Sequence, residues 1–173
     1  MSHLESDAII LRTWEFGESD LFVSFLTEKA GRLKGVAKGA RRSRKRFANC
    51  LELFCLVRLE YETKKNGRPC FLHSCRLLEP FSGLRNDFSA LSLASYMVEL
   101  AEVLFPENMA EPEALPLMLR MFRGLSDGLP QAPVRAAFEA GAMSLGGFGI
   151  RFDACCDCRR VYKNEGRAVF DPS

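Results

Sequence analysis

The sequence predicts an α+β protein of two domains, with a small β-barrel first and a group of helices after it. Residues 7–78 consist of short apolar or alternating runs between turn residues, a pattern typical of strands. Residues 87–145 instead place apolar side chains at steps of three and four, which is typical of amphipathic helices. We therefore divide the chain into a barrel at 1–80, helices at 81–150 and a final segment with a cysteine pair at 151–173.

The composition is that of an ordinary folded protein. Of the 173 residues, 47% are hydrophobic and 27% are charged, which excludes a disordered chain. No run of about 18 uncharged apolar residues occurs and the N-terminus lacks a secretion signal, so we expect neither a membrane span nor export. The seven cysteines are an odd number, which favours reduced thiols over a disulfide framework. These features predict a cytoplasmic protein.

Five strands are expected in the first domain, at residues 8–14, 21–27, 32–38, 53–63 and 69–78. Turn residues separate them, among them Gly17, Gly31 and the Asn66-Gly67 pair, which is a strong hairpin signal. Five short strands are too few for an immunoglobulin-type sandwich and fit a small closed barrel such as the OB-fold. An SH3-like barrel is the alternative.

Three helices are expected next, at residues 87–105, 112–125 and 133–145. Asp87 is placed to cap the first helix, and Pro106 ends it. Its spacing predicts one buried face made of Phe88, Leu91, Ala94, Val98, Ala101 and Phe105. The three helices should pack together.

Positive charge is concentrated in the middle of the first domain. Between Glu28 and Glu52 the chain has nine lysine and arginine residues and no acidic one. The net charge is +5 for residues 1–80 but −4 for residues 81–153. Such asymmetry indicates that the basic end is the part that meets a polyanion.

Alternation along the third strand places Arg32, Lys34 and Lys38 on one face. The following residues 41–46 extend this charge along a loop that we expect to be mobile. Such a surface suits a nucleic-acid backbone, because it neutralises phosphates without reading bases. The alternatives are a solvated face that keeps the protein soluble and, less favoured, contact with anionic lipid head groups.

Aromatic residues near the basic run in sequence offer stacking surfaces for bases, as in OB-folds that bind single strands. They are Trp14, Phe16, Phe22, Phe25 and Phe47. We expect most of them in the core and one or two exposed.

Cys155 and Cys158 have the spacing that places two thiolates on one zinc ion. One such pair is half of a structural zinc site. The other half would come from a longer natural chain or from another subunit, or else the pair binds no metal. Cys70, His73 and Cys75 are poor substitutes, because they fall on a predicted strand with alternating burial.

No catalytic constellation is recognisable. The chain lacks a P-loop, an H-E-x-x-H helix and a G-x-S-x-G elbow, and its only histidines are His3 and His73. We therefore expect that the protein is not an enzyme.

An ordered set of segments resembles the bacterial recombination mediator family RecO. The segments are AIILRT at 8–13, GESD at 17–20, LT at 26–27, GR at 31–32, GVAKGARRS at 35–43, RF at 46–47, GFG at 147–149, the cysteine pair, and VFDP at 169–172. The resemblance implies an N-terminal OB-fold, a helical domain and a partial zinc-finger-like element with a structural zinc.

The same resemblance implies a function in DNA repair and recombination. Family members anneal complementary single strands, bind single- and double-stranded DNA, and with RecR help to load RecA on DNA coated by the single-stranded-DNA-binding protein SSB, whose C-terminal tail docks on the helical domain. It also implies a nucleoid-associated protein without enzymatic turnover. Carried over by position, the DNA contacts are Arg32, Lys34, Lys38, Arg41, Arg42, Arg44, Lys45 and Arg46.

The sequence departs from the family at its end. Members with a zinc element have two cysteine pairs, whereas this chain shows only Cys155 and Cys158, which we interpret as truncation. Two other functions remain open: an adaptor that recognises protein partners through its acidic helices, and an RNA-binding protein without annealing activity.

Overall fold

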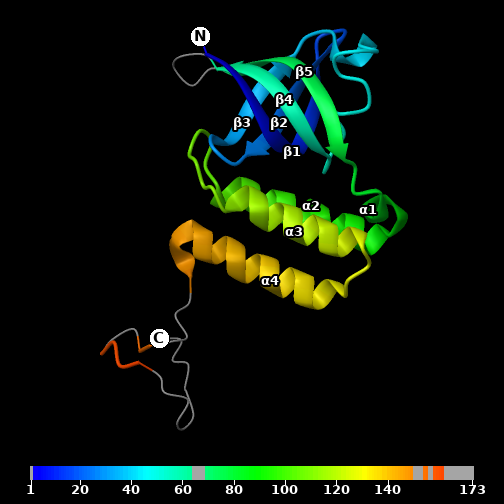
Figure 1. Ribbon diagram of the computed structural model, residues 1–173. Coiled ribbons are helices and arrows are strands. Elements are labelled where there is room, and N and C mark those ends of the chain that lie inside the picture. Colours follow the sequence, from blue (N-terminus) through cyan, green and yellow to red (C-terminus); the bar gives the residue numbers. More distant parts are fainter. Residues whose placement is uncertain (1, 64–68, 150–153, 156–157, 162–173) are drawn as a thin grey trace.

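The structure is a computed structural model that describes residues 2–63, 69–149, 154–155 and 158–161. Its first part is built from five strands, β1 (Ser2–Phe16), β2 (Asp20–Thr27), β3 (Gly31–Ala37), β4 (Leu56–Thr63) and β5 (Cys70–Glu79) (Figure 1). A short 3-10 helix, η1 (Ala40–Arg42), begins the long connection from β3 to β4.

The five strands close into a barrel in the order β1-β2-β3-β5-β4, which confirms the predicted fold class. Strand β1 closes it, because it pairs with β2 along one part of its length and with β4 along another. All neighbours are antiparallel except β3 and β5, which run parallel. Side chains that point inward, such as Ile10, Val23, Phe25 and Leu59, fill the barrel.

Strand β1 is longer than the predicted 8–14, because its first residues pair with β4. The sequence pattern did not predict this longer strand, since these residues are mostly polar and do not alternate with apolar ones. In the structure Asp7 lies opposite Arg58 and accepts a hydrogen bond of 2.7 Å from Arg58 Nε. A polar run can therefore form a strand where its charges pair across the sheet.

The second part is helical, with α1 (Ser82–Asn86), α2 (Phe88–Leu104), α3 (Ala114–Ser126) and α4 (Gln131–Met143), followed by a wider π-type turn, η2 (Ser144–Phe148). Asp87 caps α2 as predicted, accepting hydrogen bonds from the backbone N–H groups of Ser89 at 2.8 Å and Ala90 at 3.4 Å. Helix α1 was not predicted, because five residues are too few to show a period.

The predicted buried face of α2 is right for Ala94, Val98, Ala101 and Phe105 but wrong for Phe88, which is 83% exposed. Phe88 is the first residue of α2. Spacing alone assigns a residue to a face and does not show how far along the helix the packing reaches.

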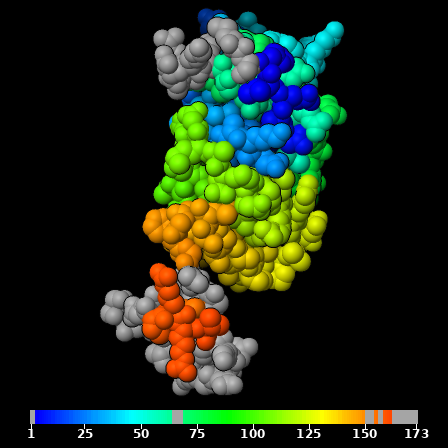
Figure 2. All heavy atoms as spheres, turned by 60° about the vertical axis from the view of Figure 1, so that its left-hand side comes forward, coloured from blue at the N-terminus to red at the C-terminus, as the bar shows by residue number. Residues whose placement is uncertain are grey.

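The barrel and the helices share one hydrophobic core. Ile9, Leu11 and Leu26 point out of the barrel and are buried among residues of α2, α3 and α4, such as Met97 and Phe122. Figures 1 and 2 show the helices packed directly beneath one end of the barrel, with α4 farthest from it and residues 154–155 and 158–161 beyond the helices. The helices are therefore needed to cover apolar barrel surface. Within the described residues, no helix is long and apolar enough to cross a membrane.

Candidate nucleic-acid interface

Strand β3 shows the predicted alternation. Leu33, Gly35 and Ala37 are buried inside the barrel, whereas Arg32 and Lys34 lie on its outer face. The structure then separates these two cations from the rest of the basic run.

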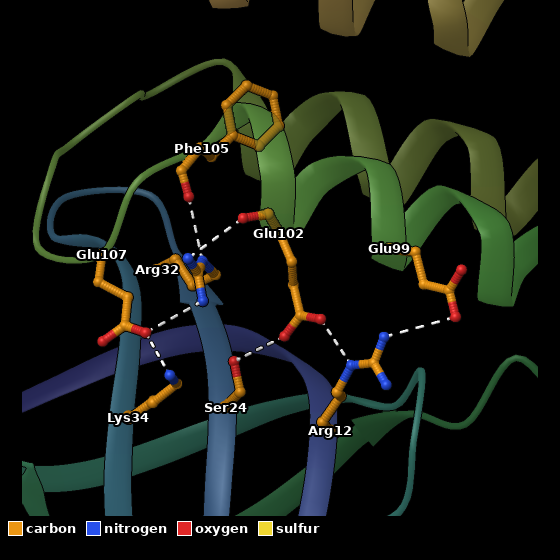
Figure 3. Close-up of polar contacts among 8 residues, drawn as sticks. All are labelled: Arg12, Ser24, Arg32, Lys34, Glu99, Glu102, Phe105 and Glu107. Carbon is orange, nitrogen blue, oxygen red and sulfur yellow. Dashed lines mark hydrogen bonds and ion pairs between the residues drawn. The ribbon is translucent and has the colours of Figure 1, made fainter.

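Arg32 lies at the end of β3 that faces the helices, and its side chain is only 11% exposed. Its Nε donates to the carbonyl of Phe105 at 3.0 Å and its Nη2 to the carbonyl of Glu102 at 3.2 Å, while Nη1 contacts the Glu107 carboxylate at 3.3 Å (Figure 3). The last carbonyls of a helix have no partner within the helix, so this guanidinium completes the end of α2.

Three carboxylates near the end of α2 face the outer surface of the barrel. Glu107 pairs with Lys34 as well as with Arg32. Glu102 accepts a hydrogen bond of 2.5 Å from Arg12 Nε and one of 3.4 Å from the Ser24 hydroxyl, and Glu99 adds an ion pair to Arg12 (Figure 3). The hydrogen bond to Glu102 raises the pKa of Arg12 above its ordinary value, so this contact remains charged.

A β-bulge in β1 makes these contacts possible. Pairing with β2 shifts between Ile10 and Arg12, so that Leu11 is the extra residue. Because of this shift, Leu11 turns toward the helices while Arg12 and Trp14 also point outward, opposite Ser24 and Phe22. Nothing in the local sequence pattern indicates the bulge.

The remaining six cations, Lys38, Arg41, Arg42, Arg44, Lys45 and Arg46, are all exposed. They follow β3 at the end of the barrel opposite the helices, where η1 is drawn in cyan in Figure 1. We call these six residues the basic loop. Within the described part of the chain, no carboxylate forms an ion pair with Arg42, Arg44 or Lys45, and only Arg41 has one, with Glu15 at 3.1 Å.

Hydrogen bonds tether the basic loop to the barrel. The Ser43 hydroxyl accepts hydrogen bonds from the N–H groups of Arg46 at 3.1 Å and Phe47 at 3.2 Å. Phe47 is buried in the barrel core, and Arg46 Nη2 donates to the Lys38 carbonyl at 2.8 Å. Arg46 therefore stabilises the conformation of the loop. The neighbouring cations are exposed to solvent on a backbone that these hydrogen bonds hold in place.

Two of the five aromatic residues are exposed as expected, but fewer than predicted are core residues, since Phe22 is half-buried. Phe25 and Phe47 are core residues, whereas Trp14 is 41% and Phe16 is 54% exposed. Phe71 was missed, although its place in the predicted strand 69–78 beside a buried Leu72 is a signal that could have found it. Its ring lies 5.9 Å from the Lys38 ammonium, within the range of a cation–π contact.

The cysteine pair does not form a zinc site with the described residues. Cys155 and Cys158 are both exposed, and no group of three or more metal-binding side chains occurs in the described ranges. Residues 156–157 and 162–173, including Val169 to Pro172, lie outside the described residues. Cys70 and Cys75 are buried in the barrel, in agreement with their expected role as small apolar residues.

Comparison with known proteins assigns both parts of the chain. Residues 1–81 match the family model described as Recombination protein O N terminal, and residues 85–165 match Recombination protein O C terminal. The two matches follow the division into barrel and helices.

Curated relatives resemble almost the whole chain. DNA repair protein RecO of Syntrophobacter fumaroxidans is 38% identical over 164 residues, covering 95% of this chain and 65% of the relative. The proteins of that name from two Anaeromyxobacter strains, Fw109-5 and K, are 34% and 33% identical, covering 98% and 99% of this chain and 66% and 67% of the relatives. This chain thus spans about two thirds of the length of the curated relatives that it matches.

Proposed function

This chain belongs to the RecO family, and we propose that it acts in DNA repair and recombination by binding DNA through its basic loop. The observation that carries the proposal is the set of six exposed cations at residues 38–46, five of which have no ion-pair partner among the described residues. Cations held close together without counter-charges repel one another, and a phosphate backbone relieves this repulsion while releasing its own counterions.

The proposed surface is smaller than the predicted set of eight residues. Arg32 and Lys34 both pair with the Glu107 carboxylate, which already supplies negative charge to them. The basic loop at the other end of the barrel carries the contact instead. Backbone contacts of this kind fix a strand on the protein and leave its sequence unread.

The family suggests a longer list of activities for the complete protein. We propose that it anneals complementary single strands and, with RecR, helps to load RecA on SSB-coated DNA, with the SSB tail bound by the helical part. We also propose that it performs no chemical conversion and is associated with the nucleoid. These proposals rest on family membership, supported by the basic loop.

The test is a variant in which Lys38, Arg41, Arg42 and Arg44 are replaced by Ala. Arg46 is kept because it holds the loop together. Fluorescence anisotropy with a labelled single strand should show weaker binding, with the slope of log affinity against log salt reduced by about 0.7 for each phosphate that the variant no longer neutralises. Annealing of complementary oligonucleotides, bare and SSB-coated, should slow in the same variant.

A matched pair of double variants controls for loss of charge in general. Arg42→Ala with Arg44→Ala removes two exposed cations from the basic loop, and Arg120→Ala with Arg135→Ala removes two from the helices. Only the first pair should weaken DNA binding. Equal effects of the two pairs, or an unchanged four-residue variant, would rule out the basic loop as the DNA surface.

A further inference from the structure

The outer face of the barrel carries a row of apolar side chains that the helices leave uncovered. Strand register places Trp14 opposite Phe22, Phe22 opposite Val36, and Val36 opposite Phe71. Residues paired directly across neighbouring strands project to the same face of a sheet, so these four side chains lie side by side across β1, β2, β3 and β5. We call them the aromatic row.

The aromatic row is open to solvent. Trp14 is 41% exposed, and Phe22, Val36 and Phe71 are half-buried. The adjacent row toward the helices, Arg12, Ser24 and Lys34, is the one that α2 and its following loop cover. The helices therefore cover this adjacent row and leave the aromatic row uncovered.

Ring contacts within the row leave faces available. The rings of Trp14 and Phe22 lie 5.8 Å apart and are tilted by 43°, and Phe16 approaches Phe22 at 6.4 Å from the next row. At the other end of the row, Phe71 meets His73 edge to face at 5.0 Å. None of these pairs is a parallel stack that would hide both ring faces.

The aromatic row borders the basic loop. Lys38 follows Val36 by two residues and extends the same outer face, and its ammonium lies 5.9 Å from the Phe71 ring. The N–H of Gly39 donates to the Asp20 carboxylate at 2.8 Å, which holds the start of the loop against β2. Phosphate-binding cations and exposed rings are thus neighbours on one surface.

We infer that the aromatic row stacks unpaired bases and makes this surface prefer single-stranded DNA to duplex DNA. The inference rests on the proposed function, since the basic loop has to hold the strand first. A base stacks on a side chain only when its own face is free, and in a duplex both faces are covered by neighbouring base pairs. The basic loop binds the phosphates of both single-stranded and duplex DNA, whereas the aromatic row increases the affinity for single-stranded DNA alone.

The chain offers a direct probe, because Trp14 is its only tryptophan. Selective excitation of tryptophan in the unmodified protein should show quenching when an oligothymidylate strand binds. Binding of a duplex of the same length, followed in parallel by anisotropy of a label on the DNA, should leave the emission nearly unchanged. Equal quenching by both forms, or none by either while both bind, would overturn the inference.

Variants supply the second readout. Trp14→Ala should reduce single-strand affinity by between about 5-fold and about 150-fold, the range that loss of one stacked base covers. Duplex affinity should change less than twofold, and the salt dependence should keep its slope because no phosphate contact is removed. Trp14→Phe retains a ring and should restore most of the single-strand affinity.

Phe148→Ala is the matched control, since it removes a ring that is 64% exposed on the helical part of the molecule. It should alter neither affinity. If Trp14→Ala weakens single-strand and duplex binding equally, or weakens neither of them, the aromatic row does not select unpaired bases. The basic loop would still bind DNA in that case. If wild-type protein binds neither form with salt dependence, the proposed function itself fails.

Discussion

Arg32 of strand β3 donates a hydrogen bond of 3.0 Å to the backbone carbonyl of Phe105, the residue that ends helix α2. Together with its contacts to Glu102 and Glu107, this bond joins the barrel to the helices. The basic run from Lys29 to Arg46 is therefore divided by function. Arg32 in its first part joins the barrel to the helices, and its second part is the basic loop, which we propose binds DNA.

Replacing Arg32 by Ala should lower the free energy of unfolding by about 2–4 kcal/mol, because helix carbonyls and a carboxylate lose a charged donor in a largely buried place. Arg32→Lys should recover only part of this loss, since an ammonium cannot reproduce the fork of the guanidinium. Urea unfolding followed by circular dichroism measures both. Lys29→Ala is the control, because Lys29 is exposed and its removal should cost less than about 0.5 kcal/mol.

Gly31→Ala should destabilise the same junction. Gly31 has φ +68°, and an added Cβ would lie 1.8 Å from the carbonyl oxygen of Met109 in the loop after α2. Gly17 has a similar φ of +65° with nothing within 4 Å, so Gly17→Ala should cost only the backbone strain of about 1–2 kcal/mol. Thermal unfolding should separate the two variants clearly. Equal midpoints would show that the loop after α2 does not approach β3 this closely.

Glu107→Gln should strengthen DNA binding. Glu107 pairs with Lys34, which shares the outer face of β3 with the aromatic row, and loss of the carboxylate charge frees this lysine for a phosphate. The salt slope should then become steeper by about 0.7, which corresponds to one additional phosphate of a single strand. Glu113→Gln, which alters an exposed carboxylate before α3, should leave the slope unchanged. Weaker binding by Glu107→Gln would contradict the expectation that Glu107 and a DNA phosphate compete for Lys34.

Alkaline pH should destabilise the barrel through its buried thiols. Burial raises the pKa of Cys70 and of Cys55, and the contact with Cys50 together with burial raises the pKa of Cys75. Because the folded pKa values are raised, the full stability is present below the ordinary thiol pKa of about 8.5 and is lost as pH rises above it, where thiols of the unfolded chain ionise. Urea midpoints at pH 8, 9 and 10 measure this loss. Cys70→Ala should make the decline less steep, whereas Cys158→Ala, at an exposed position, should not.

Much of the fold was readable from the sequence because local patterns determine it. The alternation of Leu33, Gly35 and Ala37 with cations indicated which face of β3 is buried, and Asp87 indicated the start of α2. The polar start of β1, the bulge at Leu11 and the short α1 were not readable, since each depends on contacts with distant residues.

The candidate site could be predicted from the sequence only in part. Counting charges identified the basic run but could not show that Glu107, more than 60 residues away, neutralises part of it. The aromatic row was equally hidden, because Trp14, Phe22 and Phe71 come from three strands and meet only through register. The shared core with Ile9 and Leu26 also shows that the barrel cannot be tested alone, since removal of the helices would expose it.

The most direct test of the divided basic run compares the salt dependence of single-strand binding in wild-type protein, Arg42→Ala and Arg32→Ala, at a temperature where all three are folded. We predict that Arg42→Ala lowers the slope of log affinity against log salt by about 0.7, as expected when one phosphate is no longer neutralised, and that Arg32→Ala leaves the slope unchanged. A lower slope for Arg32→Ala, or an unchanged slope for Arg42→Ala, would contradict the division.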